Sequence, residues 1–401
     1  MPLTNKPAYI AALLGAGLVI SACGSSSSGG STVSSGGSSS SSTSAPSISA
    51  TSFTQDFSAM SQLKSLASQG KGSVGVILPD TDTSSRYQEF DAPLLTKAFE
   101  TAGLSSSQIS IKNAQHSDTT FVTDAQAMIT NGATVLLIDP EDPGTGKRVD
   151  DYAKQHGVAV IDYDRITQGS YYISFDNVAV GKLIGTGFAK CASDWGVNNP
   201  DLIEMAGDPT DNNATLFKQG YDSVIQQNPS WKVAATPAGT WTPKTALTEF
   251  QGAYTAHSGV NSAIIPNDEN AGPIINWLRS NKGVKPKTFP ITGQDATLQG
   301  LQNILSGYQC GTAYKPIFLE AQAAAAVAMY VRAGQTPPSA LVNGQTSNPN
   351  DNGKNMPSVL LTPEWVTSAN MAATVVKDNF VPASQICTAK YKSACSAAGI
   401  S

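Results

Sequence analysis

The stretch VAVIDYDRI, residues 158–166, indicates both how this chain folds and where its polar chemistry lies. Val158 to Ile161 form a predicted buried strand, and Asp164 and Arg165 follow it closely, after two intervening residues. Two full charges at the end of an apolar strand cost free energy unless something pairs with them. They can pair with each other in a loop, or they can bind a ligand rich in hydroxyl groups.

Short apolar stretches of this kind alternate with helix-like segments along the chain. Before residue 158 the predicted strands are SVGVIL (73–78), QISIKN (108–113) and TVLLID (134–139). The helix-like segments between them end in Gly103, Gly132 and Gly157, where glycine favours helix termination. Apolar strands that alternate with helices predict a parallel sheet covered on both faces.

The alternation starts again after residue 176. Its predicted strands include LIEMAG (202–207), SAIIP (262–266), TFPITG (288–293) and GTAY (311–314). The sequence therefore predicts two α/β units in tandem, each of about six strands. Ligands of such sheets bind at the carboxyl ends of the strands.

The length of the chain favours two lobes, and its charge argues against nucleic acid as a partner. The chain has 401 residues, too many for a single small core. Its net charge is −5, and its Lys and Arg residues are scattered singly. Because nucleic-acid binding needs a basic face, we expect no nucleic-acid partner.

The N-terminus has the pattern of an export signal. An apolar run follows Lys6 and ends in Ile20-Ser21-Ala22-Cys23, which resembles the lipobox of bacterial lipoproteins. We predict a signal peptide over 1–22 and lipidation of Cys23; the alternative is an ordinary cleavage site with a chance Cys. Residues 23–52 are mostly Ser, Gly and Thr, which predicts a disordered tether.

Four further cysteines remain, and outside the cytoplasm they suggest two disulfides with three connectivities open. Cys387 and Cys395 are close in sequence and are expected to pair, in a C-terminal tail over 381–401. That leaves Cys191 and Cys310. Free buried thiols are the alternative.

Signatures of enzymes are weak or missing in the sequence. No G-x-S-x-G motif is present, and GTGKR (144–148) has Arg148 where a phosphate-binding loop needs Ser or Thr. His116, His156 and His257 lie in segments expected to be solvated, and NPNDNG (348–353) lacks the Glu of a calcium loop. We predict a protein that is not an enzyme and has no cofactor and no metal.

Polar side chains instead follow nearly every predicted strand. The set is Arg86, Asp164, Arg165, Asn212, Asn213, Trp241, Asn267, Asp268, Asp295 and Lys315. Carboxylates accept hydrogen bonds, Arg and Lys donate them, and a sugar hydroxyl does both. An aromatic side chain suits the apolar face of a sugar ring. Taken singly, Asp164–Arg165 could be a loop ion pair, Asn212–Asn213 a helix cap and Trp241 a core residue.

Residues 72 to 379 resemble the sugar-binding proteins of ABC importers, which have the type I periplasmic-binding fold, and most closely the D-xylose-binding branch. The matching stretches are VGVILPD, SSRYQEFD, VAVIDYDRI, YYISFDNVAVGKL, GDPTDNNATLFKQG, TWTPKTAL, IIPNDENAG, ITGQDATLQGLQNILSG, TAYKPI and VLLTPEWV. The resemblance implies two Rossmann-like, doubly wound parallel-sheet lobes joined by a three-strand hinge. It implies an N-terminal lobe of residues 72–175 plus 315–336 and a C-terminal lobe of 176–314 plus 358–380.

The resemblance also implies roles for particular residues. The positions that match the family's sugar ligands are Arg86, Asp164, Arg165, one of Asn212 and Asn213, Trp241, Asn267, Asp295 and Lys315. Tyr87 stands where the xylose-binding branch tends to carry Trp, which could change the sugar that fits. The hinge crossings are expected near 175–177, near 313–315 and within 337–358.

The implied function is capture of a monosaccharide, with D-xylose as the first expectation, for delivery to the permease of an ABC importer. Ribose, glucose, galactose or arabinose are the alternative ligands. A second alternative is a sensor that presents sugar to a membrane kinase or chemoreceptor. We expect a monomer outside the cytoplasm, attached to the membrane through its lipid anchor only.

Overall fold

The computed structural model describes residues 46–81, 84 and 86–400. The predicted signal peptide, Cys23 and the tether up to residue 45 lie outside the described residues. Among the described residues, no helix has the length and apolar character needed to span a bilayer.

A seven-stranded sheet forms the N-terminal lobe, in the order β10-β11-β5-β4-β3-β1-β2. Its strands are β1 (Ser73–Leu78), β2 (Ile109–Asn113), β3 (Ala133–Ile138), β4 (Ala159–Tyr163), β5 (Tyr172–Phe175), β10 (Gly344–Asn348) and β11 (Lys354–Leu361). All neighbours pair in parallel except β10 and β11, which are antiparallel.

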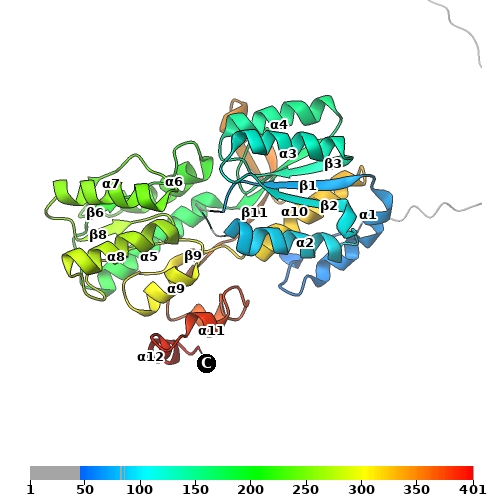
Figure 1. Cartoon of the computed structure of the whole chain (residues 1–401). Coiled ribbons are helices and arrows are strands. Elements are labelled where there is room, and N and C mark those ends of the chain that lie inside the picture. The colour runs from blue at the N-terminus through cyan, green and yellow to red at the C-terminus, as the bar shows by residue number, and fades with distance from the viewer. Residues whose placement is uncertain (1–45, 82–83, 85, 401) are drawn as a thin grey trace, which may run out of the picture. The chain divides into compact units, whose positions relative to one another are not determined.

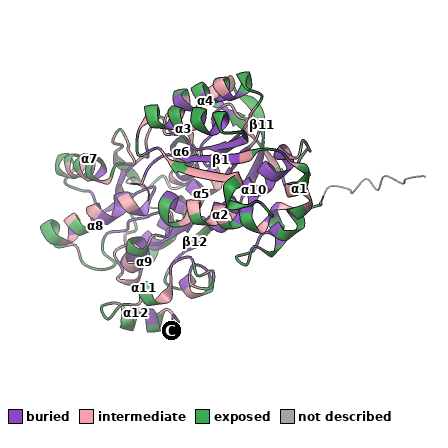
Figure 2. Ribbon diagram, turned by 45° about the vertical axis from the view of Figure 1, so that its right-hand side comes forward, coloured by how far each residue is buried: buried purple, intermediate pink, exposed green. Residues whose placement is uncertain are grey.

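Helices cover both faces of this sheet (Figure 1). They are α1 (Lys64–Gln69), α2 (Ala92–Thr101), α3 (Asp118–Thr130), α4 (Pro143–Gln155) and α10 (Ile317–Arg332). Successive residues of β1 alternate between the faces: Val76 packs in the core with α10, and Ile77 packs in the core with α3 and α4. Figure 2 shows the result, with buried strands beneath helices whose outer sides are exposed.

The C-terminal lobe has a smaller sheet, in the order β7-β6-β8, and an antiparallel pair of strands, β12 and β9. Its elements are α5 (Asn177–Asp194), β6 (Asp201–Glu204), α6 (Asn212–Ile225), β7 (Lys232–Ala235), α7 (Pro243–Ala256), β8 (Ser262–Ile264), α8 (Asp268–Lys282), α9 (Leu298–Leu305), β9 (Thr312–Tyr314) and β12 (Glu364–Val366). Single parallel bridges, Ala263–Ile291 and Gln294–Ala313, continue the sheet between β8 and β9. The predicted strand at 288–293 is therefore reduced to bridges, in a segment where Pro290 has no N–H to donate.

Short turns of helix complete the described chain. They are η1 (Ala50–Ser52), η2 (Ser58–Leu63), η3 (Tyr87–Asp91), η4 (Ser106–Gln108), η5 (Pro349–Asp351), η6 (Met371–Ala373), α11 (Ala383–Ile386) and α12 (Lys392–Ala397).

The chain crosses between the two sheets three times. The first two crossings, β5 to α5 and β9 to α10, lie near the predicted positions 175–177 and 313–315. The third lies between Leu361 and Glu364, beyond the predicted loop at 337–358. Residues 358–361 pair with β5, so they join the N-terminal sheet and not the C-terminal lobe as predicted. Pro363, which cannot donate to a strand ladder, separates β11 from β12.

The end of the predicted tether is part of the folded region. Ile48 is 1% exposed, and the Ala50 N–H donates to the Ala340 carbonyl at 3.1 Å. The prediction of disorder is therefore wrong for residues 46–52, because Ile48 and Ala50 are apolar enough to pack on the N-terminal lobe.

Two disulfides connect distant and local parts of the C-terminal lobe. Cys191 at the end of α5 is bonded to Cys310, 119 residues away, and Cys387 is bonded to Cys395, eight residues away. A cross-link reduces the conformational freedom of the unfolded chain, and it does so more for a longer loop.

Removing the long-range disulfide should therefore cost more stability than removing the local one. We expect the double variant C191S/C310S to lower the free energy of unfolding by about 2 kcal/mol more than C387S/C395S, given the two loop lengths. Denaturant titration without reductant measures both values. Equal losses in the two double variants would contradict the expectation.

Candidate functional site

One cavity collects side chains from the carboxyl ends of strands in both sheets. Its walls are Ser84, Arg86, Tyr87, Asp164, Arg165, Asp211, Asn213, Phe217, Trp241, Asn267, Gln294, Asp295 and Lys315. The unfilled space measures about 380 Å³, including the part open to solvent, so the ligand that it can surround is small.

The structure brings together all the predicted ligand-binding residues except Asn212 and Asp268. Asn212 is the first residue of α6 and lies outside the cavity wall, which Asn213 joins instead. Asp268 is 0% exposed and accepts hydrogen bonds from the Thr297 N–H at 2.9 Å and the Gln309 Nε2 at 2.7 Å. Asp268 therefore ties α8 to the start of α9, and its prediction as a ligand-binding residue is corrected.

Four wall residues were not predicted: Ser84, Asp211, Phe217 and Gln294. Asp211 precedes Asn212 in the stretch DNN and had a signal in the sequence, since it is a carboxylate after a strand. Phe217 lies within α6, where an aromatic residue indicates core packing. Gln294 is the residue before Asp295, and its Oε1 has no hydrogen-bond partner among the described residues.

Arg86 enters the cavity from the start of η3, a turn of π-helix that precedes α2. Its Nη2 lies 2.7 Å from Asp91 Oδ1 and 2.7 Å from Glu320 Oε2, and its Nη1 lies 3.3 Å from Asp164 Oδ1. All four side chains are buried. Three carboxyl groups thus surround one guanidinium, which holds Arg86 in a single orientation.

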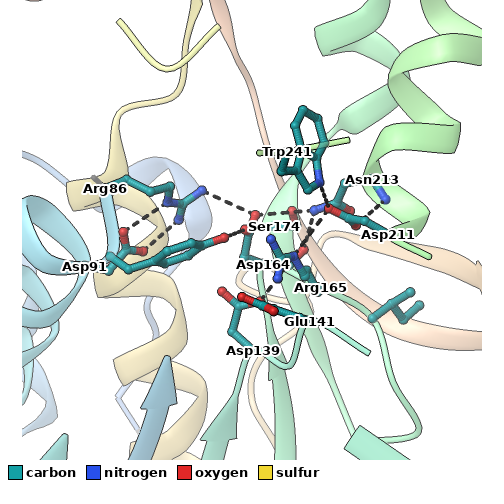
Figure 3. Close-up of polar contacts among 12 residues, drawn as sticks. Arg86, Asp91, Asp139, Glu141, Asp164, Arg165, Ser174, Asp211, Asn213 and Trp241 are labelled. Atoms are coloured by element: carbon teal, nitrogen blue, oxygen red, sulfur yellow. Dashed lines mark hydrogen bonds and ion pairs between the residues drawn. The ribbon is translucent and has the colours of Figure 1, made fainter. Parts of the chain in front are cut away.

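Asp164 is the central residue of the site (Figure 3). Its backbone is left-handed, with φ 58°, so β4 ends there and its side chain turns into the cavity. Tyr87 donates to Asp164 Oδ2 at 3.1 Å, and Asn213 donates through Nδ2 to the Asp164 carbonyl at 2.9 Å. Asp164 therefore has partners from both lobes.

Arg165, the residue after Asp164, pairs with carboxylates from both lobes. Its Nε lies 3.7 Å from Asp139 Oδ1 and 3.3 Å from Asp211 Oδ2. Asp211 also accepts from Trp241 Nε1 at 3.0 Å and from the Asn213 N–H at 2.8 Å. Asp211 therefore fixes the guanidinium and the indole in relation to each other.

Aromatic rings line the cavity between the polar groups. Trp241 packs edge to face against Phe217, with ring centroids 6.4 Å apart. A Cβ on Gly207 would lie 2.2 Å from the Trp241 ring, so glycine is required beneath the indole. A ring held in place on both sides can present a flat apolar surface to a ligand.

The C-terminal lobe supplies the remaining polar groups. Asn267 caps α8 by accepting from the Asn270 N–H at 3.0 Å. Asp295 Oδ1 lies 3.1 Å from Lys315 Nζ, and Asp295 has φ 86°. A non-glycine residue at such an angle is costly and is retained where the surrounding structure requires it, often at functional sites.

The charges that line the cavity balance. Arg86, Arg165 and Lys315 face Asp164, Asp211 and Asp295. Burial alone would raise the pKa of Asp164, but Arg86, Lys315 and Arg165 together hold it below its usual value. A cavity with matched ionised donors and acceptors favours a neutral ligand with many hydroxyl groups over an ion of either sign.

Comparisons with protein families, with individual proteins and with solved structures agree on one family. A family model described as a periplasmic binding protein domain matches residues 74–336. The chain is 34% identical over 309 residues to the D-xylose-binding periplasmic protein of Escherichia coli (strain K12), a match that covers 75% of this chain and 88% of that protein. It is 30% identical over 303 residues to the D-xylose-binding periplasmic protein of Haemophilus influenzae, covering 74% and 86%.

Solved structures show the same similarity in three dimensions. A carbohydrate transporter solute binding protein from Chloroflexus aurantiacus, in complex with D-glucose, has a TM-score of 0.68 and 26% identity. That match covers 78% of this chain and 97% of the other. The similarity extends over nearly the full length of the compared protein and includes both lobes.

The carboxylates around Arg86 predict a pH dependence of stability. Burial raises the pKa of Glu320 to about 8; Arg86 opposes this rise, and Asp164 and Asp91 add to it. An unfolded Glu has a pKa of 4.5, so between about pH 4.5 and 8 the native state holds a proton that the unfolded state has lost. The free energy of unfolding should therefore fall as the pH rises through this range.

Glu320→Gln, which resembles the protonated side chain, should remove this contribution. We expect the stability of E320Q relative to the wild type to rise by at least about 1.4 kcal/mol between pH 5 and pH 8, the equivalent of one pKa unit. Denaturant titrations at the two pH values measure it. The exposed Glu100→Gln on α2 is the control and should show no such rise. Parallel stability profiles for E320Q and the wild type would refute the protonation of Glu320.

Proposed function

Because the chain belongs to the periplasmic binding protein family, whose members bind solutes and are not enzymes, we propose that it captures a monosaccharide in the cavity between its lobes. The family and the predicted type I fold are confirmed by the comparisons and by the two sheets with three crossings. The sugar, its delivery and the anchoring of the protein are the parts that we propose.

The observation that supports sugar binding most strongly is the chemistry of the cavity wall. The N-terminal lobe contributes two ionised donors and an ionised acceptor, Arg86, Arg165 and Asp164, and the C-terminal lobe contributes ionised acceptors and an amide, Asp211, Asp295 and Asn267. A ring of hydroxyl groups can satisfy both kinds at once. A ligand that touches both lobes stabilises the closed form, whereas a ligand that touches one lobe cannot.

D-Xylose is the sugar that we propose first. Two relatives at 34% and 30% identity are D-xylose-binding periplasmic proteins, and their similarity covers most of this chain. Glucose is the main alternative, since a structural neighbour at 26% identity holds D-glucose. Tyr87 bears on the choice, because its hydroxyl occupies one oxygen of Asp164 at 3.1 Å and leaves the other toward Arg86.

The permease of an ABC importer would recognise the closed form of the two lobes. We propose that Cys23, in the sequence Ile20-Ser21-Ala22-Cys23, carries a lipid that keeps the protein at the outer face of the membrane. The Ser/Gly-rich segment after it would give the folded region reach. We also propose a monomer, which the cavity supports because one chain supplies all of its walls.

Sugar binding is tested with neighbouring asparagines. Asn213 lines the cavity and Asn212 does not, although both were candidates from the sequence. Calorimetry of the full chain with D-xylose is expected to show binding that Asn213→Ala weakens about tenfold, because removing the amide leaves buried hydrogen-bonding groups without a partner, at a cost of about 1–3 kcal/mol. Asn212→Ala should bind as the wild type does.

A thermal-shift screen of D-xylose, D-glucose, D-ribose, D-galactose and L-arabinose identifies the preferred sugar, since a ligand of the native state raises the melting temperature. Sodium D-glucuronate serves as the charged comparison and should give no shift. The proposal fails if none of the neutral sugars changes the melting temperature, or if N212A and N213A lose affinity equally.

The lipid anchor has its own test. Expressed in bacteria with labelled palmitate, the full chain should carry the label and sediment with membranes, while Cys23→Ala should be unlabelled and soluble after export. An unlabelled wild-type protein would show that Ile20-Ser21-Ala22-Cys23 is an ordinary cleavage site.

A further inference from the structure

Three side chains with metal-binding atoms meet at the carboxyl edge of the N-terminal sheet. Asp80 follows β1, His116 follows β2 and Glu141 follows β3. These strands are neighbours in the order β3-β1-β2, so their ends lie side by side. One ligand atom from each residue lies within 4.8 Å of the other two.

The three side chains are in contact, and they differ in exposure. His116 Nδ1 lies 2.7 Å from Glu141 Oε1, and His116 Nε2 lies 3.9 Å from Asp80 Oδ1. The Asp80 side chain is 0% exposed, whereas His116 is 39% and Glu141 33% exposed. Asp80 is thus fixed by its surroundings, and the other two can adjust toward it.

The electrostatics of the cluster favour a cation. Two carboxyl groups, Asp80 and Glu141, face one imidazole, which carries at most one positive charge. Arg165, the nearby guanidinium, forms its ion pairs with Asp139 and Asp211.

The cluster opens onto a hollow that is separate from the sugar cavity but shares a border with it. His116 and Glu141 line it together with Asp118, Asp142, Asp208, Thr210 and other residues. Arg165, Asp211 and Trp241 belong to both hollows. This hollow has room for water molecules beside a bound ion.

We propose that Asp80, His116 and Glu141 bind a divalent transition-metal ion of the zinc class at the entrance to the cleft. One imidazole nitrogen and two carboxylate oxygens are ligands that zinc accepts, at about 2.0–2.2 Å, with water completing the shell. Bonds of this length require the ligand atoms to rearrange: His116 Nδ1 and Glu141 Oε1, now 2.7 Å apart, must separate to admit the ion, which these two partly exposed side chains can do. The inference stands on these side chains and does not depend on the sugar.

The test uses Zn²⁺ in calorimetry and Co²⁺ in visible absorption, both on the full chain near neutral pH. One equivalent of Zn²⁺ is expected to bind, and Co²⁺ should give the absorption bands of a site with a nitrogen ligand. His116→Ala and Glu141→Gln should each weaken Zn²⁺ binding by at least about tenfold, since even changes outside the ligand shell cost about 10–100-fold.

His156→Ala is the matched control, because His156 is an exposed histidine on the same lobe and contacts the Tyr152 carbonyl. It should leave Zn²⁺ affinity and stoichiometry unchanged. The proposal is overturned if Zn²⁺ does not bind, or if H116A binds it as the wild type does. Melting temperatures of the variants without metal separate loss of a ligand from loss of the fold.

Discussion

The site depends on the burial of Asp164 among partners from both lobes. A carboxylate removed from water costs several kcal/mol unless ion pairs and hydrogen bonds replace its hydration. Here Arg86 and Tyr87 contact its side chain from the N-terminal lobe, and Asn213 holds its carbonyl from the C-terminal lobe. The left-handed backbone at Asp164 ends β4 there, and its side chain lines the cavity together with residues of both lobes.

The surrounding carboxyl groups extend this arrangement and fix the two guanidinium groups. Glu320 and Asp91 hold Arg86, while Asp139 and Asp211 hold Arg165. Since each cation is already oriented by a carboxylate behind it, a ligand does not need to order the site. The hydroxyl groups of a neutral polyol can replace the water in the cavity without leaving an unpaired charge. An ionic ligand would instead add a charge that has no partner.

Local patterns in the sequence were sufficient for the order of the elements as far as β9 and for most of the cavity wall, but they did not predict β10 and β11. Asp164, Arg165 and Asn267 could be predicted because polar residues directly after apolar strands have one common location, the carboxyl edge of the sheet. The pattern could not separate Asn212 from Asn213, or Asn267 from Asp268, because adjacent residues at a helix start point in different directions that only the packed helix defines. Asp211 acts both as the cap of α6 and as a partner of Arg165. An Asp before a helix is explained by capping alone, so the sequence did not indicate its contact with Arg165.

Contacts between distant residues were beyond local patterns altogether. Glu320 lies 234 residues from Arg86 and reaches it only because α10 returns to the N-terminal sheet. Asp80, His116 and Glu141 are also separated in sequence, so the prediction that the chain has no metal site could not take their meeting into account. The third crossing was misplaced because one stretch, VLLTPEWV, contributes strands to both sheets.

The most direct test of the two-lobe account is a crystal structure of the protein grown with D-xylose. The account predicts one sugar in the cavity, with hydroxyl oxygens within hydrogen-bond distance of Asp164 or Arg165 on one lobe and of Asn267 or Asp295 on the other. A sugar bound to one lobe alone, or density elsewhere with the cavity filled by water, would contradict it.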